Sequence, residues 1–378
     1  MAEPKKIIIV AGEASGDLHA SHLVAAIRDL IPETRFFGLG GSRMRAEGVE
    51  IYYDLTTLSV VGFFEVIRHL ATIRQVFDLL LEKAEEIKPD CAILVDYPGF
   101  NLRLAQQLKK RNIKVIYYIS PQIWAWGLRR VHLIKKVVDK MIVILKFEQE
   151  LYRKYGIEAS FVGHPLLDIA KPTIPKSQFL QSVGLALNKT TVALLPGSRN
   201  KEVERLLPIM LQVCKIIRKR NPQIQFILLR ASSVANKIFK KCLSAIDFPL
   251  ASTENQTYNG LNTSDAAIVT SGTATLETAI LQKPMVVIYK VSFLTWLFIK
   301  RMIKIPYIGL VNVVAGKKIA PECLQYRARP EIIADHILEM LDQSKFPEIK
   351  NELAKLREAL GEEGASNRAA QIVVGLLN

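Results

Sequence analysis

A carboxylate that could act as a base follows one of the most apolar runs of the chain. Asp90–Val95 has the pattern of a short buried strand, and Asp96 comes directly after it, before a Tyr-Pro-Gly turn. Ligands of α/β proteins bind at the carboxyl ends of parallel strands, so a carboxylate held there is suited to general base catalysis. His19 and His22, which follow the first predicted strand, are rival candidates for the base.

The turn Ser271-Gly272-Thr273 has the features of an anion site. It follows the apolar, β-branched run Ala266–Thr270 and precedes a helix. Glycine permits the sharp turn, Ser271 and Thr273 can cap the helix, and the free N–H groups at a helix start attract an anion. Glu277, one turn later, could accept hydrogen bonds from sugar hydroxyls, so the stretch suits a nucleotide-sugar. An ordinary capped turn with a solvated Glu277 is the open alternative.

Two other turns resemble this one in composition. Gly12–Asp17 follows the predicted strand Lys5–Ala11 and lacks both the GxGxxG and the GK[ST] spacing, so neither a dinucleotide site nor a P-loop is predicted. Its candidate binding residues are Glu13, Ser15 and Gly16, and a loop capped by Asp17 is the alternative. After the predicted strand Thr191–Leu195, Arg199 could form a fork with two oxygens of a pyrophosphate.

The loop after the predicted strand Lys114–Ile119 contains two tryptophans, Trp124 and Trp126, and then Arg129 and Arg130. Aromatic rings beside arginines suit a sugar, a phosphate or nucleic-acid bases. A tryptophan pair packed into the wall between domains is the alternative.

These turns belong to two series of alternating predicted strands and helices. The proline-containing segment Ile169–Lys176 has linker character and separates the two series. We therefore expect an α/β protein with two Rossmann-like domains that face a cleft. The first covers residues 1–168, the second covers residues 169–360, and a helix at about 361–378 packs back on the first domain.

The composition limits the compartment and the partners. The chain has 378 residues, of which 49% are hydrophobic, enough for two cores. Its four cysteines are scattered without metal-ligand spacing, so we expect a reducing cytoplasm, no disulfides and no metal site. No signal peptide or membrane-spanning run is expected. The net charge of +15 predicts an anionic partner, which could be nucleic acid, acidic lipid or a phosphorylated substrate.

Two segments, Leu55–Ile87 and Val291–Ile305, combine excess apolar residues with basic ones. This combination predicts contact with a membrane surface or an acyl chain, and packing inside the domain is the alternative for the first segment. The residues predicted to make the contact are Val60, Val61, Phe63, Phe64, Trp296 and Phe298.

Seven blocks in collinear order over nearly the whole chain resemble the lipid A disaccharide synthase family. They are AGEASGD (11–17), VDYPGFN (95–101), SPQIWAW (120–126), VGHP (162–165), LPGSR (195–199), SGTATLE (271–277) and PYIGLVNVVAG (306–316). The resemblance implies a GT-B glycosyltransferase fold. It also implies an inverting reaction of lipopolysaccharide synthesis in Gram-negative bacteria. UDP-2,3-diacylglucosamine and 2,3-diacylglucosamine 1-phosphate give a β-1,6-linked disaccharide and UDP.

The resemblance also implies roles for individual residues. Asp96 would be the catalytic base, and Arg199 would stabilise the leaving UDP without a metal or a cofactor. Many family members carry an acidic residue where this chain has Gly99. The residues implied in substrate binding are Glu13, Ser15, Gly16, Ser271, Gly272, Thr273, Glu277 (ribose), Asn312 (UDP), Glu322 and Gln325 (donor sugar).

The implied partners are the two acylated sugars and the anionic inner face of the inner membrane, with the protein bound peripherally, and not nucleic acid. The last helices and the apolar segments could pack between subunits, which favours a homodimer. One alternative is another GT-B enzyme that acts on UDP-N-acetylglucosamine, such as the peptidoglycan glycosyltransferase or the 2-epimerase. The other is a noncatalytic basic protein that binds membranes or nucleic acid.

Overall fold

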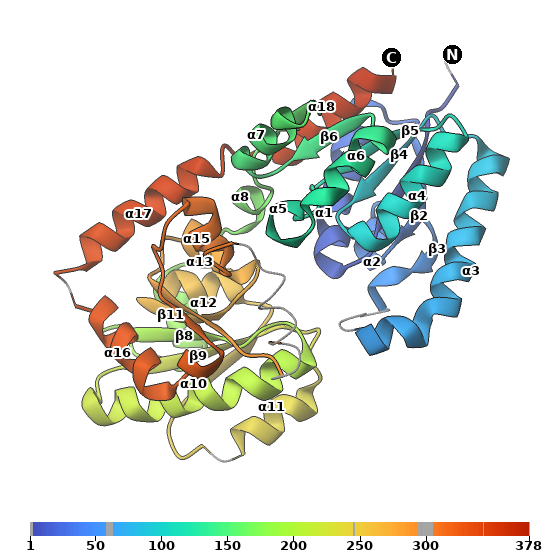
Figure 1. The fold of residues 1–378 in the computed structure, drawn as a ribbon. Coiled ribbons are helices and arrows are strands. Elements are labelled where there is room, and N and C mark those ends of the chain that lie inside the picture. Colours follow the sequence, from blue (N-terminus) through green and yellow to red (C-terminus); the bar gives the residue numbers. More distant parts are fainter. Residues whose placement is uncertain are drawn as a thin grey trace. The chain divides into compact units, whose positions relative to one another are not determined.

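The computed structural model describes residues 3–57, 63–244, 246–292, 296, 305–342 and 344–377, without the side chains of 57, 63–69 and 126. The chain divides into two compact units. The first is Met1–Pro165 together with Leu360–Asn378, and the second is Leu166–Ala359. Each unit is a parallel β-sheet with helices on both faces (Figure 1). The expected fold class, α/β with two Rossmann-like sheets, is confirmed.

The first sheet has seven parallel strands in the order β3-β2-β1-β4-β5-β6-β7. The strands are β1 Lys6–Ala11, β2 Arg35–Gly40, β3 Glu50–Asp54, β4 Cys91–Val95, β5 Lys114–Tyr118, β6 Lys140–Val143 and β7 Ala159–Phe161. The chain leaves β1 towards β2 and β3 and then returns to place β4 on the other side of β1. The order of the strands therefore reverses between β1 and β4, which is where open α/β sheets bind their ligands.

Helices of the first unit cover both faces of its sheet. On one face α1 (Ala14–Leu30) packs against α18 (Ala365–Leu377). On the other face α3 (Phe63–Ile87), α4 (Pro98–Lys110) and α6 (Val131–Val137) share a core with Ile8 and Val10 of β1. The remaining short helices of this unit are α2 (Ser42–Ala46), α5 (Ile123–Trp126) and α7 (Lys146–Lys154).

The second sheet has six parallel strands in the order β10-β9-β8-β11-β12-β13. The strands are β8 Thr191–Leu195, β9 Gln225–Arg230, β10 Ala251–Glu254, β11 Ala266–Thr270, β12 Met285–Tyr289 and β13 Glu322–Leu324. Its order reverses between β8 and β11, so the second unit has the same kind of switch point. Its helices are α8 Leu166–Ile169, α9 Lys176–Ser182, α10 Asn200–Arg220, α11 Asn236–Leu243, α12 Thr257–Thr263, α13 Ala274–Ile280, α15 Leu310–Ala315, α16 Pro330–Met340 and α17 Phe346–Ala359.

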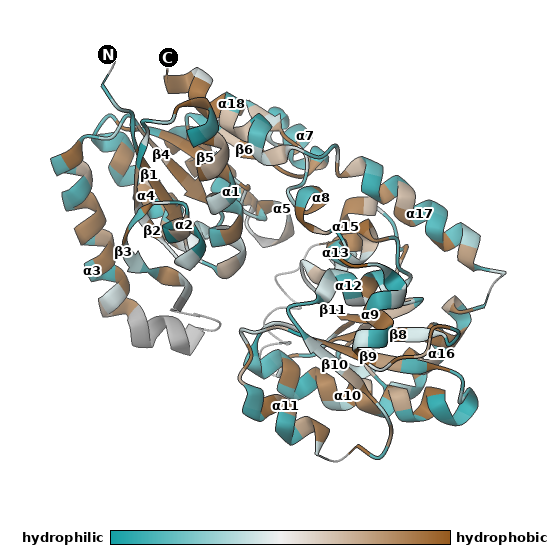
Figure 2. Cartoon of the chain, turned by 180° about the vertical axis from the view of Figure 1, so that it is seen from behind, coloured by the Kyte–Doolittle hydropathy of each residue, from teal (hydrophilic) through white to brown (hydrophobic). Residues whose placement is uncertain are grey.

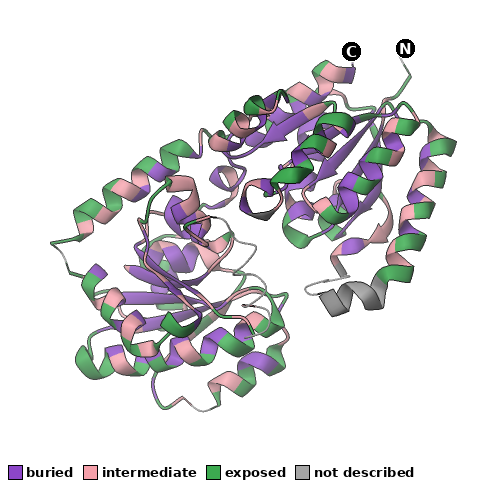
Figure 3. Ribbon diagram, viewed as in Figure 1, coloured by how far each residue is buried: buried purple, intermediate pink, exposed green. Residues whose placement is uncertain are grey.

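The four strands at the switch points, β1, β4, β8 and β11, are almost entirely apolar. All residues of β4, β8 and β11 are buried, as are all but the first of β1. β1 and β4 appear as hydrophobic strands in Figure 2, and the strands of both sheets are mostly buried in Figure 3. Parallel strands covered on both faces require such continuous apolar runs, because neither side of the pleat faces water.

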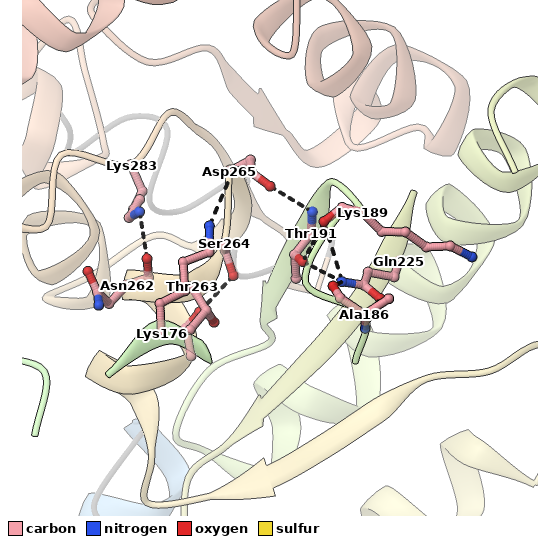
Figure 4. A network of polar contacts seen from close by, with 11 residues as sticks. Lys176, Ala186, Lys189, Thr191, Gln225, Asn262, Thr263, Ser264, Asp265 and Lys283 are labelled. Carbon is pink, nitrogen blue, oxygen red and sulfur yellow. Dashed lines mark hydrogen bonds and ion pairs between the residues drawn. The ribbon is translucent and has the colours of Figure 1, made fainter. Parts of the chain in front are cut away.

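At the amino edges of both sheets, aspartate side chains join neighbouring strands by hydrogen bonds. Asp90, Asp139 and Asp265 each precede a strand and exchange two hydrogen bonds with one residue near the start of the neighbouring strand, which is Lys6, Val115 and Thr191 respectively. For Asp265, Oδ2 accepts the N–H of Thr191 at 2.8 Å and its own N–H donates to the Thr191 carbonyl at 2.8 Å (Figure 4). These carboxylates fix the register of the strands at the edge opposite the switch-point turns.

Two helices begin close to the strands that precede them. α1 begins at Ala14, inside the predicted Gly12–Asp17 turn, so that turn is shorter than expected, and α4 begins at Pro98, inside the Tyr-Pro-Gly turn after Asp96. Glu322 is the first residue of the edge strand β13. Proline at the first helical position supplies a suitable φ and needs no N–H partner, which explains the early start of α4.

Substitution of Asp265 by alanine removes the acceptor for the Thr191 N–H at the start of a buried strand. We expect the free energy of unfolding to fall by about 1 to 2 kcal/mol. Urea denaturation followed by circular dichroism measures the change. The control is Asp247→Ala, which removes an exposed ion pair with Lys215 and should cost about 0.5 kcal/mol or less. Equal effects of the two substitutions would contradict this role of Asp265.

Candidate active site

Asp96 lies at the carboxyl end of β4 in an unusual backbone turn. Asp96 and Tyr97 both have φ of 46°, in the left-handed region that side chains other than glycine rarely adopt. The turn is held by three hydrogen bonds. The Asp96 N–H donates to the Tyr118 carbonyl at 3.2 Å, and the Asp96 carbonyl accepts from Asn101 Nδ2 at 2.8 Å and from the Tyr117 hydroxyl at 2.5 Å. Such strain persists only where the surroundings enforce it, and it is typical of functional sites.

The turn after β1 packs directly against the turn that carries Asp96. A Cβ atom at Gly12 would lie 2.3 Å from the ring of Tyr97, so only glycine leaves room for that ring. Glu13 follows and is the N-cap residue of α1, while Ser15 is exposed and Gly16 is buried. Glu13 and Asp96 therefore come from neighbouring strands at the first switch point.

The Asp96 carboxyl group has a raised pKa of about 6. Burial is the main cause, the negative charge of Glu13 adds to it, and a backbone hydrogen bond at Tyr97 opposes it. A carboxylate with this pKa is ionised at neutral pH and is a stronger base than an ordinary aspartate. It therefore fits the requirements of a general base.

The rival histidines lie on α1. His19 is buried, and its pKa is lowered to about 4 by burial and by the nearby His22. His164, in the VGHP block, has its pKa lowered to about 3 by burial and by His19. His22 is half-buried. His19 is thus neutral at pH 7 and far less basic than free imidazole, which argues against His19 as the base.

Asp17 has a structural function in this turn. Its carboxylate accepts the backbone N–H groups of Gly41, Arg43 and Met44 at 2.7 to 3.2 Å. It therefore caps the start of α2 and joins the first turn of α1 to the end of β2.

The loop after β5 is fixed by a residue that the sequence did not indicate. The Trp124 indole N–H donates to Glu148 Oε1 at 3.1 Å, and the Trp124 ring packs edge-on against Phe147 at 5.4 Å. Burial raises the pKa of Glu148 to about 8, so this carboxyl group is mostly protonated at neutral pH. Glu148 lies four residues before the buried Tyr152, on the inward face of α7, and that spacing was the available signal.

In the second unit, Arg199 is at the carboxyl end of β8 and is the N-cap residue of α10. Its side chain is 46% exposed and pairs with Glu202 at 3.3 Å. Gly197 has φ of 112°, and a Cβ there would lie 2.6 Å from Glu202 Oε2. The Glu202 carboxylate therefore lies against the Pro-Gly-Ser-Arg turn and is an anion beside Arg199.

The Ser271-Gly272-Thr273 turn lies on the neighbouring strand, β11. Gly272 has φ of 147° with open space around its Cβ position, and Thr273 is exposed. The expected capping is wrong, because the Thr273 side chain makes no capping hydrogen bond and the Ser271 hydroxyl donates to the Ile308 carbonyl at 3.2 Å. Glu277 accepts the Tyr258 hydroxyl at 2.9 Å, and burial raises its pKa.

Asn312 and Glu322 are bonded to each other and to the loop between them. Glu322 accepts the N–H groups of Ile308 and Gly309 and the Asn312 amide at 2.9 Å. Asn312 is fully buried, and its amide also bonds to the backbone of Ile319 and Ala320. Both side chains hold backbone in place, and their predicted contacts with UDP and the donor sugar stay predictions.

The side-chain amide of Gln325 forms a hydrogen bond through its oxygen but not, among the described residues, through its nitrogen. Its φ is 50°, and its Oε1 accepts the Val291 N–H at 3.2 Å. Its Nε2 is buried and has no partner among the described residues. A buried amide donor without an acceptor suits contact with a ligand.

Most of the residues predicted to contact a membrane lie outside the described part of the structure. Val60, Val61 and Phe298 lie outside the described residues, as do the side chains of Phe63 and Phe64, and Trp296 is half-buried. No helix within the described ranges is long and apolar enough to cross a membrane. Nor does the described part of the chain contain a group of three His, Cys, Asp or Glu side chains that could hold a metal ion.

Comparisons with known proteins agree on one family. The model of the family described as lipid-A-disaccharide synthetase matches residues 7–375. Lipid-A-disaccharide synthase from Syntrophus aciditrophicus is 46% identical over 375 residues, covering 99% of this chain and 98% of that protein. The synthase from Geobacter sulfurreducens is 43% identical, covering 98% and 97%, and that from Coxiella burnetii (strain CbuK_Q154) is 40% identical, covering 99% of each.

Solved structures with this fold include two enzymes that are distant in sequence. UDP-GlcNAc 2-epimerase from Neisseria meningitidis bound to UDP-GlcNAc has a TM-score of 0.64 at 14% identity, covering 98% of this chain and 100% of that chain. The glycotransferase of kitacinnamycin has a TM-score of 0.67 at 15% identity, covering 100% of each. At these identities the likeness shows the fold alone, which is the two-sheet GT-B fold.

The burial of Asp96 predicts that removing its charge stabilises the protein. The pKa of about 6 in the folded state exceeds the ordinary 3.8, so the cost of ionising Asp96 accumulates between pH 3.8 and about 6 and is constant above. Asp96→Asn should therefore raise the free energy of unfolding by roughly 2 to 3 kcal/mol at pH 8 and hardly at all at pH 4. Asparagine also tolerates the left-handed backbone.

Urea denaturation at both pH values measures the difference. Asp78→Asn, a change at an exposed i,i+4 ion pair with Arg74, is the control and should have little effect at either pH. A destabilised Asp96→Asn variant at pH 8 would refute the buried-charge interpretation.

Proposed function

We propose, from the premise that the chain belongs to the lipid-A-disaccharide synthetase family, that Asp96 is the general base of its glycosyl transfer. The protein forms the lipid A disaccharide from lipid-linked sugars. It joins UDP-2,3-diacylglucosamine to 2,3-diacylglucosamine 1-phosphate and releases UDP. The observation that carries the proposal is the strained turn at the β1/β4 switch point, which holds a carboxylate of raised pKa beside Glu13.

Asp96 accepts the proton of the acceptor's 6-hydroxyl as the oxygen attacks C1 of the donor sugar. The bond from O6 to C1 forms on the face opposite the bond from C1 to UDP, which breaks, so the configuration at C1 inverts and the product is β-linked. The proton ends on Asp96 and the negative charge on UDP. One base is sufficient for this single displacement.

Arg199 stabilises the charge that develops on the departing UDP. In the structure Glu202 is its partner, but an exposed pair of this kind contributes little to stability. A diphosphate offers two oxygens to the guanidinium fork and can replace Glu202 as the anion. A bound metal ion is not needed for this role, and we expect a chelator to leave the activity intact.

Other residues of the second unit bind the donor in this proposal. Glu277, oriented by Tyr258, accepts the ribose hydroxyls, and the Ser271-Gly272-Thr273 turn contacts the diphosphate. Gln325 donates to the donor sugar from its Nε2, which has no partner among the described residues. Asn312 and Glu322 act by holding the backbone around Ile308 and Gly309. Ser15 and Gly16 contact the acceptor in the first unit.

The two units divide the substrates between them. The first unit, with Asp96, binds the acceptor, and the second unit, with Arg199, binds the UDP-sugar. The net charge of +15 supports binding to the anionic inner face of the inner membrane, where the acylated substrates reside. We also propose a homodimer, supported by the apolar segments predicted from the sequence. The family match does not favour epimerisation of UDP-N-acetylglucosamine or a noncatalytic binding function.

Substitution of Asp96 by asparagine should lower kcat about 10²- to 10⁴-fold, because the acceptor hydroxyl loses its base. In the unsubstituted protein kcat/KM should rise tenfold per pH unit up to about pH 6 and then level off, because only ionised Asp96 is active. Release of UDP in detergent, measured from pH 4.5 to 8.5, tests both expectations. Near-full turnover by Asp96→Asn would transfer the role of base to another residue, with His22 the next candidate.

Substitution of Arg199 by alanine should reduce kcat about 10²- to 10³-fold by removing a charge from the leaving-group site. Arg220→Ala is the control at the other end of α10, where Arg220 pairs with the exposed Asp335. The control should retain activity. An Arg199→Ala variant with unchanged kcat, measured with saturating donor in chelator, would exclude Arg199 from leaving-group stabilisation.

A further inference from the structure

At the carboxyl edge of the first sheet, the loops on the two sides of Asp96 carry charges of opposite sign. On the side of β1 the loop carries Glu13, whose negative charge raises the pKa of Asp96. On the side of β5 the chain runs through Ser120 and the short helix α5 to Arg129 and Arg130, which belong to a 3₁₀ turn at Leu128–Arg130. A negatively charged group of a ligand near Asp96 would therefore be repelled by the β1 side and attracted by the β5 side.

Arg129 and Arg130 have the charge and the exposure that an anion site requires. Both side chains are exposed, and among the described residues no ion pair to either of them is observed. Arg130 follows β5, which pairs with β4 up to Val95 and Tyr118, directly before Asp96. In agreement with this placement, the charge of Arg130 slightly opposes the raised pKa of the buried Tyr117 hydroxyl, which donates to the Asp96 carbonyl. The 3₁₀ turn leads into α6, which packs against α4, the helix that follows Asp96.

The backbone that carries the two arginines is fixed. The Arg130 N–H donates to the Gly127 carbonyl at 2.9 Å, and the 3₁₀ turn packs against α5. α5 is tied to α7 by the hydrogen bond from Trp124 to Glu148. The guanidinium groups are therefore presented from a held turn, which lowers the entropy lost when they bind a ligand.

We propose that Arg129 and Arg130 bind the phosphate monoester of the acceptor and so select a phosphorylated sugar. This inference rests on the proposed function, in which the acceptor's 6-hydroxyl lies at Asp96. In glucosamine 1-phosphate, C1 and C5 flank the ring oxygen, and C6 is attached to C5. With O6 at Asp96, the phosphate on C1 can lie towards β5, where two guanidinium forks match its oxygens.

Other cations near this edge are less well placed. Arg43 on α2 and Lys146 on α7 each follow a strand that is two positions from β4 in the sheet. Arg103 is on α4, more than one turn beyond its start, and the helix leads away from the carboxyl edge. The loop after β5 is the only one of these directly beside β4 on the side without Glu13.

The test compares two acceptors, 2,3-diacylglucosamine 1-phosphate and the same sugar without phosphate, with saturating UDP-2,3-diacylglucosamine. The Arg129→Ala/Arg130→Ala double variant should raise KM for the phosphorylated acceptor about 10- to 100-fold with little change in kcat. Its kinetics with the unphosphorylated acceptor should match those of the unsubstituted protein, so the preference for phosphate should disappear. Arg129→Lys/Arg130→Lys, which keeps the charges without the forks, should recover part of it.

Arg35→Ala is the control, since Arg35 is exposed at the amino edge of the same sheet and should leave both KM values unchanged. An unchanged preference for phosphate in the double alanine variant, or an equal rise in KM for both acceptors, would overturn the proposal. Circular dichroism excludes misfolding as the cause of a loss. Failure of the unsubstituted protein to transfer sugar to either acceptor would instead refute the proposed function.

Discussion

Ionising a half-buried carboxylate at the end of a parallel strand costs free energy, because the surrounding protein displaces water from it, and the first unit is arranged to sustain that cost at Asp96. The left-handed turn at Asp96 and Tyr97 is enforced by Asn101 and Tyr117, which bind the Asp96 carbonyl, and by Gly12, which admits the Tyr97 ring. The same packing brings Glu13 close, and its charge adds to the effect of burial on the pKa. Backbone strain, burial and like charge thus converge on one side chain, as is typical of groups that catalyse reactions.

Both sheets place their candidate residues at the reversal of strand order. In the first sheet these residues follow β1 and β4, and in the second they follow β8 and β11. Because the strands on either side of a reversal are connected by helices on opposite faces, no helix covers the edge between them. The same topology in both units therefore places a carboxylate, the proposed base, in the first unit and an arginine, the proposed partner of the leaving group, in the second. Transfer of a sugar requires both, because the acceptor must lose a proton while the leaving group gains a charge.

The sequence predicts the buried strands best, because parallel strands covered on both faces have continuous apolar runs, as in Thr191–Leu195 and Ala266–Thr270. The edge strands β3 and β10 lack such runs and were not predicted, since their residues are only partly buried. The interior strand β2 was not predicted either, because glycines at 38 and 40 interrupt its apolar run. Asp96 and Arg199 could be identified from their positions after strands. The raised pKa of Asp96, the bond between Trp124 and Glu148 and the mutual bonding of Asn312 and Glu322 could not. These depend on contacts between segments that are distant in sequence, which local patterns do not encode.

The fold of the first unit is expected to hold the Asp96 carboxyl group at a pKa suited to a base. The most direct measurement is a titration of the carboxyl ¹³C resonance of Asp96, assigned by its absence from the Asp96→Asn variant. A pKa of about 6 is predicted for the folded protein. A shift towards lower values is expected in a Glu13→Gln variant, since one negative charge is removed. A pKa near the ordinary 3.8, unchanged by loss of the Glu13 charge, would contradict the account.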